Sequence, residues 1–340
     1  MTDPDAIADT LAPERQTRLV GHEAVRAALH AQIAAGRLPG AVLLHGPQGI
    51  GKATLAFTLA RDILAATGDE DAHRVDEQVA AGAHPNLAVL RRRPREGRGY
   101  YTVIRVEDVR ELREELHMTR GRAGHRVAIV DSIDDCNPNA ANALLKTLEE
   151  PPPETTFFLV SHRPGQLLPT IHSRCHSLAL RPLADAQVAA ALAVQRPDAD
   201  SDEVARAVAL ARGRPRRGFE ALALSPESIL GGLQSWLQDP LRHPSAVHLS
   251  LADALAADRD SPDLSFAREL LNDWLAGEAR AAAIAGERMR LASAGELWEK
   301  ADALFAETDE INLDMRQTLV TVFDAIRKHV QATSSPAAQQ

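Results

Sequence analysis

Cysteine and long apolar runs are both scarce in this sequence of 340 residues. The two cysteines, Cys136 and Cys175, stand far apart and form no C-x-x-C pair, so neither a zinc module nor a disulfide framework is expected. No apolar stretch is long enough to span a bilayer. The first fifteen residues carry acids and a proline where a signal peptide needs a basic start and an apolar centre. These absences argue against the secreted and membrane classes, and they predict a cytoplasmic protein with no membrane partner.

Positive charge is also in short supply. Lysine and arginine total 38 against 47 acidic residues, which leaves a net charge of -9 at pH 7. Such a balance argues against a protein that coats nucleic acid by itself. A local exception is the run RRRPREGR, residues 91–98, with five arginines in eight positions. Because no aromatic residue is interleaved in this run, a solvated loop is the favoured interpretation, and a DNA contact shared with other chains is the alternative.

Strand-like and helical segments alternate between about residue 20 and residue 180, as they do in a parallel sheet covered by helices. The strands are expected at residues 41–45, 86–90, 126–131, 156–161 and 177–180. After Pro182 the pattern is helical, and near the end Leu319, Phe323 and Ile326 fall on one stripe. The fold class predicted is therefore an α/β core followed by helical regions.

The length of the chain is compatible with two or three domains. We expect an α/β nucleotide-binding-type domain, a small helical domain, a larger helical domain and a disordered tail, at residues 1–180, 181–224, 225–333 and 334–340. The boundaries follow the changes from strand-containing to helical pattern and then to the polar end of the chain.

The segment HGPQGIGKATLA, residues 45–56, is almost a phosphate-binding loop. It follows an apolar strand candidate and opens a helix, a setting in which backbone N–H groups converge on phosphate oxygens. The glycines of the loop are Gly46, Gly49 and Gly51. Lys52 would reach the outer phosphates. The alternative is a glycine turn with an exposed lysine.

The loop pattern G-x-x-x-x-G-K-[ST] fails at its last position, where Ala53 replaces the hydroxyl that normally ligates magnesium. Thr54 is the next residue, and one step along a helix rotates its hydroxyl by about 100°. We therefore do not expect the Thr54 hydroxyl to take over as magnesium ligand, although Thr54 stays among the nucleotide-binding candidates.

The second half of such a site is an apolar strand that ends in an acid facing magnesium, followed by a glutamate that orients the attacking water. The segment RVAIVDSID supplies Asp131 and then Ser132 in place of that glutamate. Ser132 is a poor general base because its pKa is far from neutral. Asp134 is a possible substitute, but because it stands three residues further on, it is rather expected to face solvent or to cap a helix. Two defects at one chemical step predict a site that does not hydrolyse nucleotide, unless residues distant in sequence fill both roles.

Several longer segments carry a family likeness. The segments LVGHEAVRAAL (19–29), NALLKTLEEPP (142–152), SRC (173–175) and INLDMRQTLVTVF (311–323) resemble the clamp-loader ATPases of the AAA+ superfamily, and within them the delta-prime family of bacterial DNA polymerase III. The likeness covers most of the chain and is weakest between about residues 225 and 295. It implies an AAA+ core, a helical lid domain and a C-terminal collar domain used for oligomerisation.

The resemblance also implies a function. Such a protein is one subunit of a heteropentamer with gamma/tau motor subunits and a delta subunit, which loads the sliding clamp onto primed DNA during replication and belongs to the polymerase (nucleotidyltransferase) holoenzyme. Delta-prime scaffolds the ring and does not turn over ATP alone. Arg174 of the SRC motif would be an arginine finger that acts in trans on a neighbouring motor subunit. The alternative from the residues is a self-sufficient AAA+ ATPase, and Ala53 and Ser132 speak against it.

The resemblance suggests two further site residues and removes one module. Ser161 stands where the family places a sensor for the terminal phosphate; the alternative is that its hydroxyl caps the next turn. Arg216 stands where the family places a second sensor; the alternative is that it belongs to a solvated basic turn. Many relatives carry a four-cysteine zinc module after the helix of the phosphate loop, but here that stretch offers His73 and His84 without cysteine. We therefore expect no zinc or other metal and no required cofactor, with weak ATP or ADP binding left open.

Overall fold

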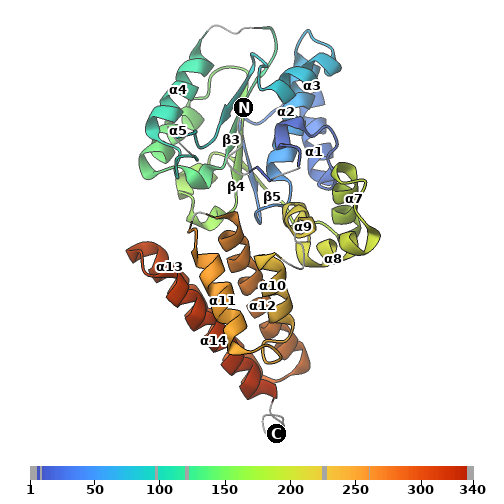
Figure 1. The fold of residues 1–340 in the computed structure, drawn as a ribbon. Helices are drawn as coiled ribbons and strands as arrows, with labels where there is room; N and C mark the ends of the chain where they lie inside the picture. Colours follow the sequence, from blue (N-terminus) through green and yellow to red (C-terminus); the bar gives the residue numbers. More distant parts are fainter. Residues whose placement is uncertain are drawn as a thin grey trace. The chain divides into compact units, whose positions relative to one another are not determined.

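The computed structural model describes residues 6–7, 10–95, 99–118, 122–223, 228–259 and 261–334. The chain divides into two compact units, Met1–Ala223 and Leu224–Gln340 (Figure 1). The finer division of the first unit into an α/β and a small helical domain stays a prediction. Most of the tail predicted at 334–340, and residues 96–98 of the arginine run, lie outside the described residues.

The first unit is built on a parallel sheet of five strands in the order β2-β3-β4-β1-β5. The strands are β1 (Ala41–His45), β2 (Leu87–Leu90), β3 (Arg126–Asp131), β4 (Thr155–Ser161) and β5 (His176–Ala179). The central strand β4 is buried along its whole length, which explains its continuous apolar run TTFFLVS, since a strand covered on both faces need not alternate. Each predicted strand is confirmed to within one residue at either end.

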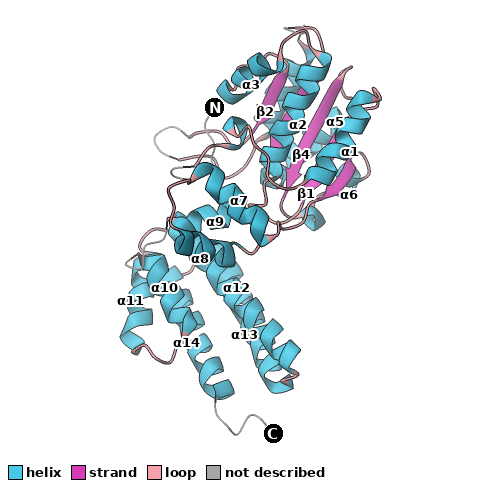
Figure 2. Cartoon of the chain, turned by 90° about the vertical axis from the view of Figure 1, so that its right-hand side faces the viewer, coloured by secondary structure: helices cyan, strands magenta, loops and turns pink. Residues whose placement is uncertain are grey.

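Helices cover both faces of this sheet (Figures 1 and 2). On one face lie α1 (Glu23–Ala34), α2 (Lys52–Thr67) and α3 (Ala72–Ala81), and on the other lie α4 (Val106–His117) and α5 (Pro138–Glu149). Local signals start two of them: Asp71 accepts a hydrogen bond from Arg74 N, and Asn137 accepts one from Ala140 N with Pro138 in the first turn. The predicted α/β core is confirmed.

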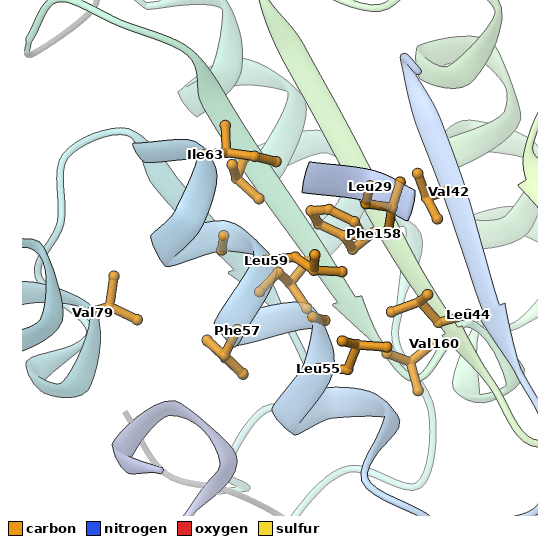
Figure 3. Close-up of a cluster of buried hydrophobic side chains, with 14 of the residues drawn as sticks. Leu29, Val42, Leu44, Leu55, Phe57, Leu59, Ile63, Val79, Phe158 and Val160 are labelled. Atoms are coloured by element: carbon orange, nitrogen blue, oxygen red, sulfur yellow. The ribbon is translucent and has the colours of Figure 1, made fainter. Parts of the chain in front are cut away.

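Alternate residues of the strands feed two separate cores. On β4, Phe158 and Val160 pack on the α2 side, whereas Phe157 and Leu159 pack on the α4 and α5 side. Figure 3 shows the first of these cores, in which side chains of α2 meet those of β1 and β4. Because fully burying a large apolar side chain contributes about 1.5–3 kcal/mol, this core holds α2, and with it the end of the phosphate loop, rigidly on the sheet.

Three short helices follow the sheet within the same unit: α7 (Asp185–Gln195), α8 (Ser201–Ala211) and α9 (Pro215–Leu222). They pack around Val188, Leu192 and Phe219. Gly213, with a φ of 77°, turns the chain between α8 and α9, and a Cβ there would lie 2.6 Å from Leu183 O. The turn therefore needs glycine, and it brings the start of α9 to the phosphate loop, where Arg216 N donates to Gly49 O at 3.1 Å.

The regular elements described in the second unit are all helices: α10 (Ile229–Gln238), α11 (Ser245–Ala256), α12 (Pro262–Ala285), α13 (Arg288–Ile311) and α14 (Met315–Ser334). Trp236 is fully buried, with its ring 5.0 Å from that of Phe323. The stripe predicted on the last helix is buried as well, at Leu319, Phe323 and Ile326. Within the described ranges, no helix is both long enough and apolar enough to cross a bilayer.

Candidate nucleotide site and an exposed arginine

The phosphate-loop motif forms the connection between β1 and α2. Gly46 and Gly51 have φ angles of 149° and 94°, which L side chains rarely adopt. At Gly46 a Cβ would come within 2.3 Å of Leu180 O, and at Gly49 within 2.8 Å of Arg216 Cβ. The loop thus runs tightly against the segment after β5 and the start of α9, so the glycine-rich sequence is required by close approach as well as by backbone angle.

Lys52, the first residue of α2, is folded back onto the loop. Its ammonium group donates to Gly46 O at 2.7 Å and to Pro47 O at 2.6 Å, and the residue is 3% exposed. Burial lowers the pKa of Lys52 to about 8, while the nearby carboxylates of Asp131 and Asp134 work in the opposite direction. The side chain is therefore mainly charged at pH 7, and a phosphate at this place would compete with two backbone carbonyls for it.

A cavity of about 240 Å³ opens beside the loop. Its walls come from the loop, from the segment that includes the short helix η1 (Pro13–Arg15), and from α7 and α9. Apolar side chains mix in the lining with polar candidates, among them Lys52, Thr54, Asp131, His162 and Arg216. Concave, mainly apolar sites with a few convergent polar groups are typical of small-molecule pockets.

Asp131 does end β3 at this cavity, but its carboxylate is already paired. Arg91 approaches it with Nη2 at 3.1 Å and Nε at 3.2 Å from Oδ2. The same guanidinium contacts Glu14 Oε2 at 3.2 Å. The side chains of Arg91 and Glu14 are 5% and 3% exposed. Neither of the two environments predicted for residues 91–98 describes Arg91, which lies inside the fold in a charge cluster.

Arg92 and Arg93, the next two arginines of the run, also pair with acids of the same chain, whereas Arg95 is exposed. Arg92 lies 3.4 Å from Asp135, and Arg93 pairs with Asp108 at 3.0 Å and with Glu111 at 2.6 Å. The Arg93 side chain remains 43% exposed. The favoured interpretation as a solvated loop was therefore wrong for Arg91, because the acids at the end of β3 and on η1 hold its guanidinium inside the fold.

The sensor candidate Ser161 is fully buried at the end of β4. Its Oγ donates to Asp134 Oδ1 at 2.9 Å, and Asp134 also accepts from the backbone N–H groups of His162 at 2.5 Å and Arg163 at 3.2 Å. Asp134 thus caps the turn after β4, a role that differs from the helix cap or solvent-facing position expected for it. Ser132, in the place of the water-orienting glutamate, is 4% exposed.

His162 was not singled out from the sequence, yet it lines the cavity. Burial, reinforced by the charge of Lys52, lowers the pKa of His162 to about 4, so the imidazole is neutral at pH 7. Its Nδ1 atom is buried and has no hydrogen-bond partner among the described residues. The remaining sensor candidate, Arg216, lines the same cavity and pairs with Glu220 at 2.9 Å.

Arg174 lies away from all of these groups, after the short helix α6 (Pro169–His172) and just before the edge strand β5. Its side chain is 35% exposed. The guanidinium contacts Glu149 Oε1 at 2.6 Å and Thr170 O at 3.1 Å. The neighbouring Cys175 thiol has its pKa raised to about 11 by burial, and burial likewise raises that of Cys136 to about 12, so both thiols stay protonated at neutral pH.

The stretch without cysteine carries a charge cluster in place of a metal site. The carboxylate of Glu70, 5% exposed, pairs with Arg74 at 3.1 Å, with His84 at 3.4 Å, and with Arg122. His73 lies apart on the surface, with 83% of its side chain exposed. Searching the described ranges finds no group of His, Cys, Asp or Glu side chains suited to a metal ion.

The structure therefore brings together most of the predicted nucleotide candidates: Lys52, Thr54, Asp131 and Arg216 line the cavity with Gly49 and Gly51. Gly46 and the buried Ser161 are not in this lining. Arg174, predicted to act on a neighbouring subunit, is partly exposed. Sequence reasoning missed Arg91, Glu14 and His162. The strand pairing explains why Arg91 was missed: β2 and β3 pair in parallel with Leu90 opposite Val130, so the residues that follow, Arg91 and Asp131, emerge side by side at the same edge of the sheet.

Comparison with known proteins bears directly on the predicted family. Residues 21–184 match the family described as "DNA polymerase III, delta subunit". The chain is 40% identical over 180 residues to DNA polymerase III subunit delta' of Pseudomonas aeruginosa, a stretch that covers 52% of this chain and 53% of that protein. It is 34% identical over 185 residues to DNA polymerase III subunit gamma/tau of Mycobacterium tuberculosis, covering 53% of this chain and 31% of that protein.

The chain thus spans about half the length of the delta' relative that it matches, 53% of it. Among solved structures, a DNA polymerase III gamma subunit-related protein from Thermotoga maritima superposes with a TM-score of 0.45 at 17% identity, over 89% of this chain and 98% of that one. The sequence matches confirm the resemblance inferred from the motifs. Residues 21–184 of this chain therefore match the DNA polymerase III delta-subunit family, and delta' subunits are among the relatives of this part of the chain.

Proposed function

We propose that this chain is a non-hydrolysing delta' subunit of a bacterial clamp loader, which scaffolds the ring and lends Arg174 to the ATP site of a neighbouring motor subunit. In this proposal its partners are gamma/tau and delta subunits in a heteropentamer, the sliding clamp, and primed DNA held by the assembled complex. It acts in the cytoplasm, with the α/β core, the helical lid and the C-terminal collar as its three domains.

The observation that carries the proposal is the exposed guanidinium of Arg174 in a unit whose own centre lacks the groups for cleavage. Ala53 and Ser132 stand at the positions of the metal-binding hydroxyl and the water-orienting glutamate. Arg174 is 35% exposed and precedes the edge strand β5, a place from which a side chain can reach another protein chain. An always-charged planar guanidinium suits stabilisation of a transferring phosphoryl group.

The test is ATP turnover by the chain alone and by the reconstituted complex. We expect no turnover above background from the purified chain, and clamp- and DNA-stimulated turnover once motor and delta subunits are added. Arg174→Ala in the complex should slow the neighbouring motor site by about 10³-fold or more. Arg113→Ala, at an exposed arginine of α4, is the matched control and should leave the complex as active as before. Unchanged turnover with Arg174→Ala would contradict the finger role.

A second candidate function is a self-sufficient ATPase of the motor type. The 34% identity to a gamma/tau subunit over 53% of this chain favours it. Magnesium-dependent turnover by the purified chain, abolished by Lys52→Ala, would support this candidate over the first.

A further inference from the structure

The nucleotide site is unsuited to the magnesium ion that such a loop normally binds together with nucleotide. One magnesium ligand is missing because Ala53 offers a methyl group. The second, the Asp131 carboxylate, lies 3.1 Å from Arg91 Nη2. Asp134 cannot replace it without giving up Ser161 Oγ and the two backbone N–H groups that it accepts. The donor set that remains therefore does not fit a hard divalent cation.

Arg91 brings to this place the positive charge that a metal would otherwise supply. Its guanidinium lies between the carboxylates of Asp131 and Glu14 and is 5% exposed. Its Cζ atom also lies 5.3 Å from the centre of the Phe57 ring, the face of which attracts cations. A divalent ion bound to Asp131 would lie within a few ångströms of the buried Arg91 guanidinium, and the two positive charges would repel each other. If the ion displaced the guanidinium from Asp131, Arg91 would lose one of its two carboxylate contacts while still buried, which is energetically costly.

The groups that can receive phosphate oxygens are present without a metal. The loop glycines present backbone N–H groups at the start of α2. Lys52 lines the cavity with a charged ammonium group, and the neutral imidazole of His162 has a buried Nδ1 that lacks a hydrogen-bond partner among the described residues. An imidazole nitrogen can donate to an anionic oxygen when its tautomer is set by that contact.

The geometry points to a metal-free nucleotide site: we propose that Arg91 stands in for the divalent cation, and that the cavity binds the phosphates of a purine or pyrimidine nucleotide without magnesium. This inference rests on the proposed function, in which the chain needs a stable loop and no cleavage. Asp131 connects the arrangement to the cavity, because it lines the cavity while its carboxylate contacts Arg91. Glu14 holds Arg91 from the other side, and its backbone carbonyl accepts a hydrogen bond from Arg61.

The first experiment compares the affinity of the full chain for ADP in magnesium and in EDTA, read from a fluorescent ADP derivative or by calorimetry. We expect the two dissociation constants to agree within a factor of two, and Lys52→Ala to abolish binding. Loss of ADP binding on chelation overturns the inference, and so does a lack of ADP binding in both buffers.

The second experiment counts bound metal directly, with Mn²⁺ as the magnesium substitute and electron paramagnetic resonance as the readout, in the presence of ADP. We expect no specific Mn²⁺ in the natural chain. Ala53→Ser alone, which restores the hydroxyl, should still bind none, because Arg91 continues to hold Asp131. Specific Mn²⁺ binding by either of these two proteins overturns the inference without any need for a variant of Arg91.

The gain of metal should come when the guanidinium is removed as well. Ala53→Ser combined with Arg91→Gln keeps a donor between the two carboxylates but removes the charge, and this protein should bind one Mn²⁺ with ADP. Ala53→Ser combined with Arg92→Gln is the matched control, since Arg92 lies 3.4 Å from Asp135 and not on Asp131, and it should bind none. If the combination with Arg91→Gln is unstable because the Glu14 carboxylate has lost its cation, adding Glu14→Gln removes that buried charge. Absence of Mn²⁺ from a folded Arg91 variant overturns the inference.

These outcomes are separable from those of the proposed function. Metal bound by the natural chain, with no ATP turnover, would remove the role given to Arg91 and leave the scaffold and the Arg174 finger untouched. Loss of the Arg174 effect in the complex would leave the metal-free site standing.

Discussion

Two arginines of the first unit, Arg91 and Arg174, show how differently the same side chain is used in one protein. Arg91 has 5% of its side chain exposed and contacts two carboxylates. Arg174 has 35% of its side chain exposed and contacts Glu149, of which 41% is exposed. A buried guanidinium is fixed by the cost of leaving it unpaired, but an exposed one is held weakly and can change partner. The comparison separates a cation that is fixed between two carboxylates inside the fold from one that remains partly in solvent.

The largest expected effect tests the buried member of this comparison. Arg91→Ala leaves Glu14 and Asp131 facing each other without the cation, so the free energy of unfolding should fall by about 3–5 kcal/mol. Urea unfolding followed by circular dichroism measures this loss. Arg92→Ala, at a side chain 24% exposed, is the control and should cost about 1 kcal/mol or less. Equal effects of the two variants would show that Arg91 is no more structural than its neighbour.

The next effect concerns the loop that the buried cluster supports. Gly46→Ala would place a Cβ 2.3 Å from Leu180 O at a φ of 149°, and we expect a loss of about 1–3 kcal/mol in unfolding free energy together with loss of ADP binding. Gly51→Ala is the comparison, because nothing lies within 4 Å of its Cβ position. It keeps the cost of its positive φ and should be the milder of the two. The reverse order would mean that contact with Leu180 does not shape the loop.

The pH dependence of the loop follows from Lys52, whose pKa is lowered to about 8 by burial. Above pH 8 the folded chain loses this proton while the unfolded chain keeps it, so the unfolded state binds more protons and stability should rise with pH up to the ordinary lysine pKa. ADP affinity should move in the opposite direction and fall by up to about tenfold per pH unit above pH 8, because phosphate binding needs the charged form. Lys52→Met should remove the stability trend, which thermal melts from pH 7 to 10 would show, and it should abolish ADP binding as Lys52→Ala does; ADP titrations of the natural chain over the same range measure the affinity trend. An ADP affinity that stays constant over this range would contradict a role for the Lys52 charge.

The smallest expected effect tests the exposed member. Arg174→Ala removes a partly solvated pair with Glu149, so the unfolding free energy of the isolated chain should change by about 1 kcal/mol or less. The same variant should impair the reconstituted complex strongly. A large destabilisation of the isolated chain would instead place Arg174 among the structural arginines and end the contrast with Arg91.

Much of this structure was readable from local patterns. The five strands, the loop before α2 and the helical second half follow from runs of apolar residues and from glycine, proline and capping residues close to the elements they affect. The two defects at Ala53 and Ser132 were visible because each is a single position in a known spacing. The family likeness that they accompanied is confirmed over residues 21–184.

The arginine run shows where such reading stops. The sequence RRRP looks like a polar loop, since a string of charges is usually solvated. It could be interpreted otherwise only by knowing that β2 lies next to β3 and that the segment around Glu14 returns to the same edge. The cap that Asp134 provides to the turn after β4 was not predicted for the same reason, because its partners are Ser161 at the end of β4 and His162 just after it.

The sequence by itself therefore determined the elements, their order and the missing hydroxyl at position 53, because these depend on neighbours along the chain. Tertiary structure decided which charges meet: Arg91 is 40 residues from Asp131 and 77 from Glu14, and a parallel sheet with helical crossovers is what brings them within contact distance. Electrostatic pairing acts through space and depends on burial, so its outcome is set only when the fold has placed both partners and excluded the water between them.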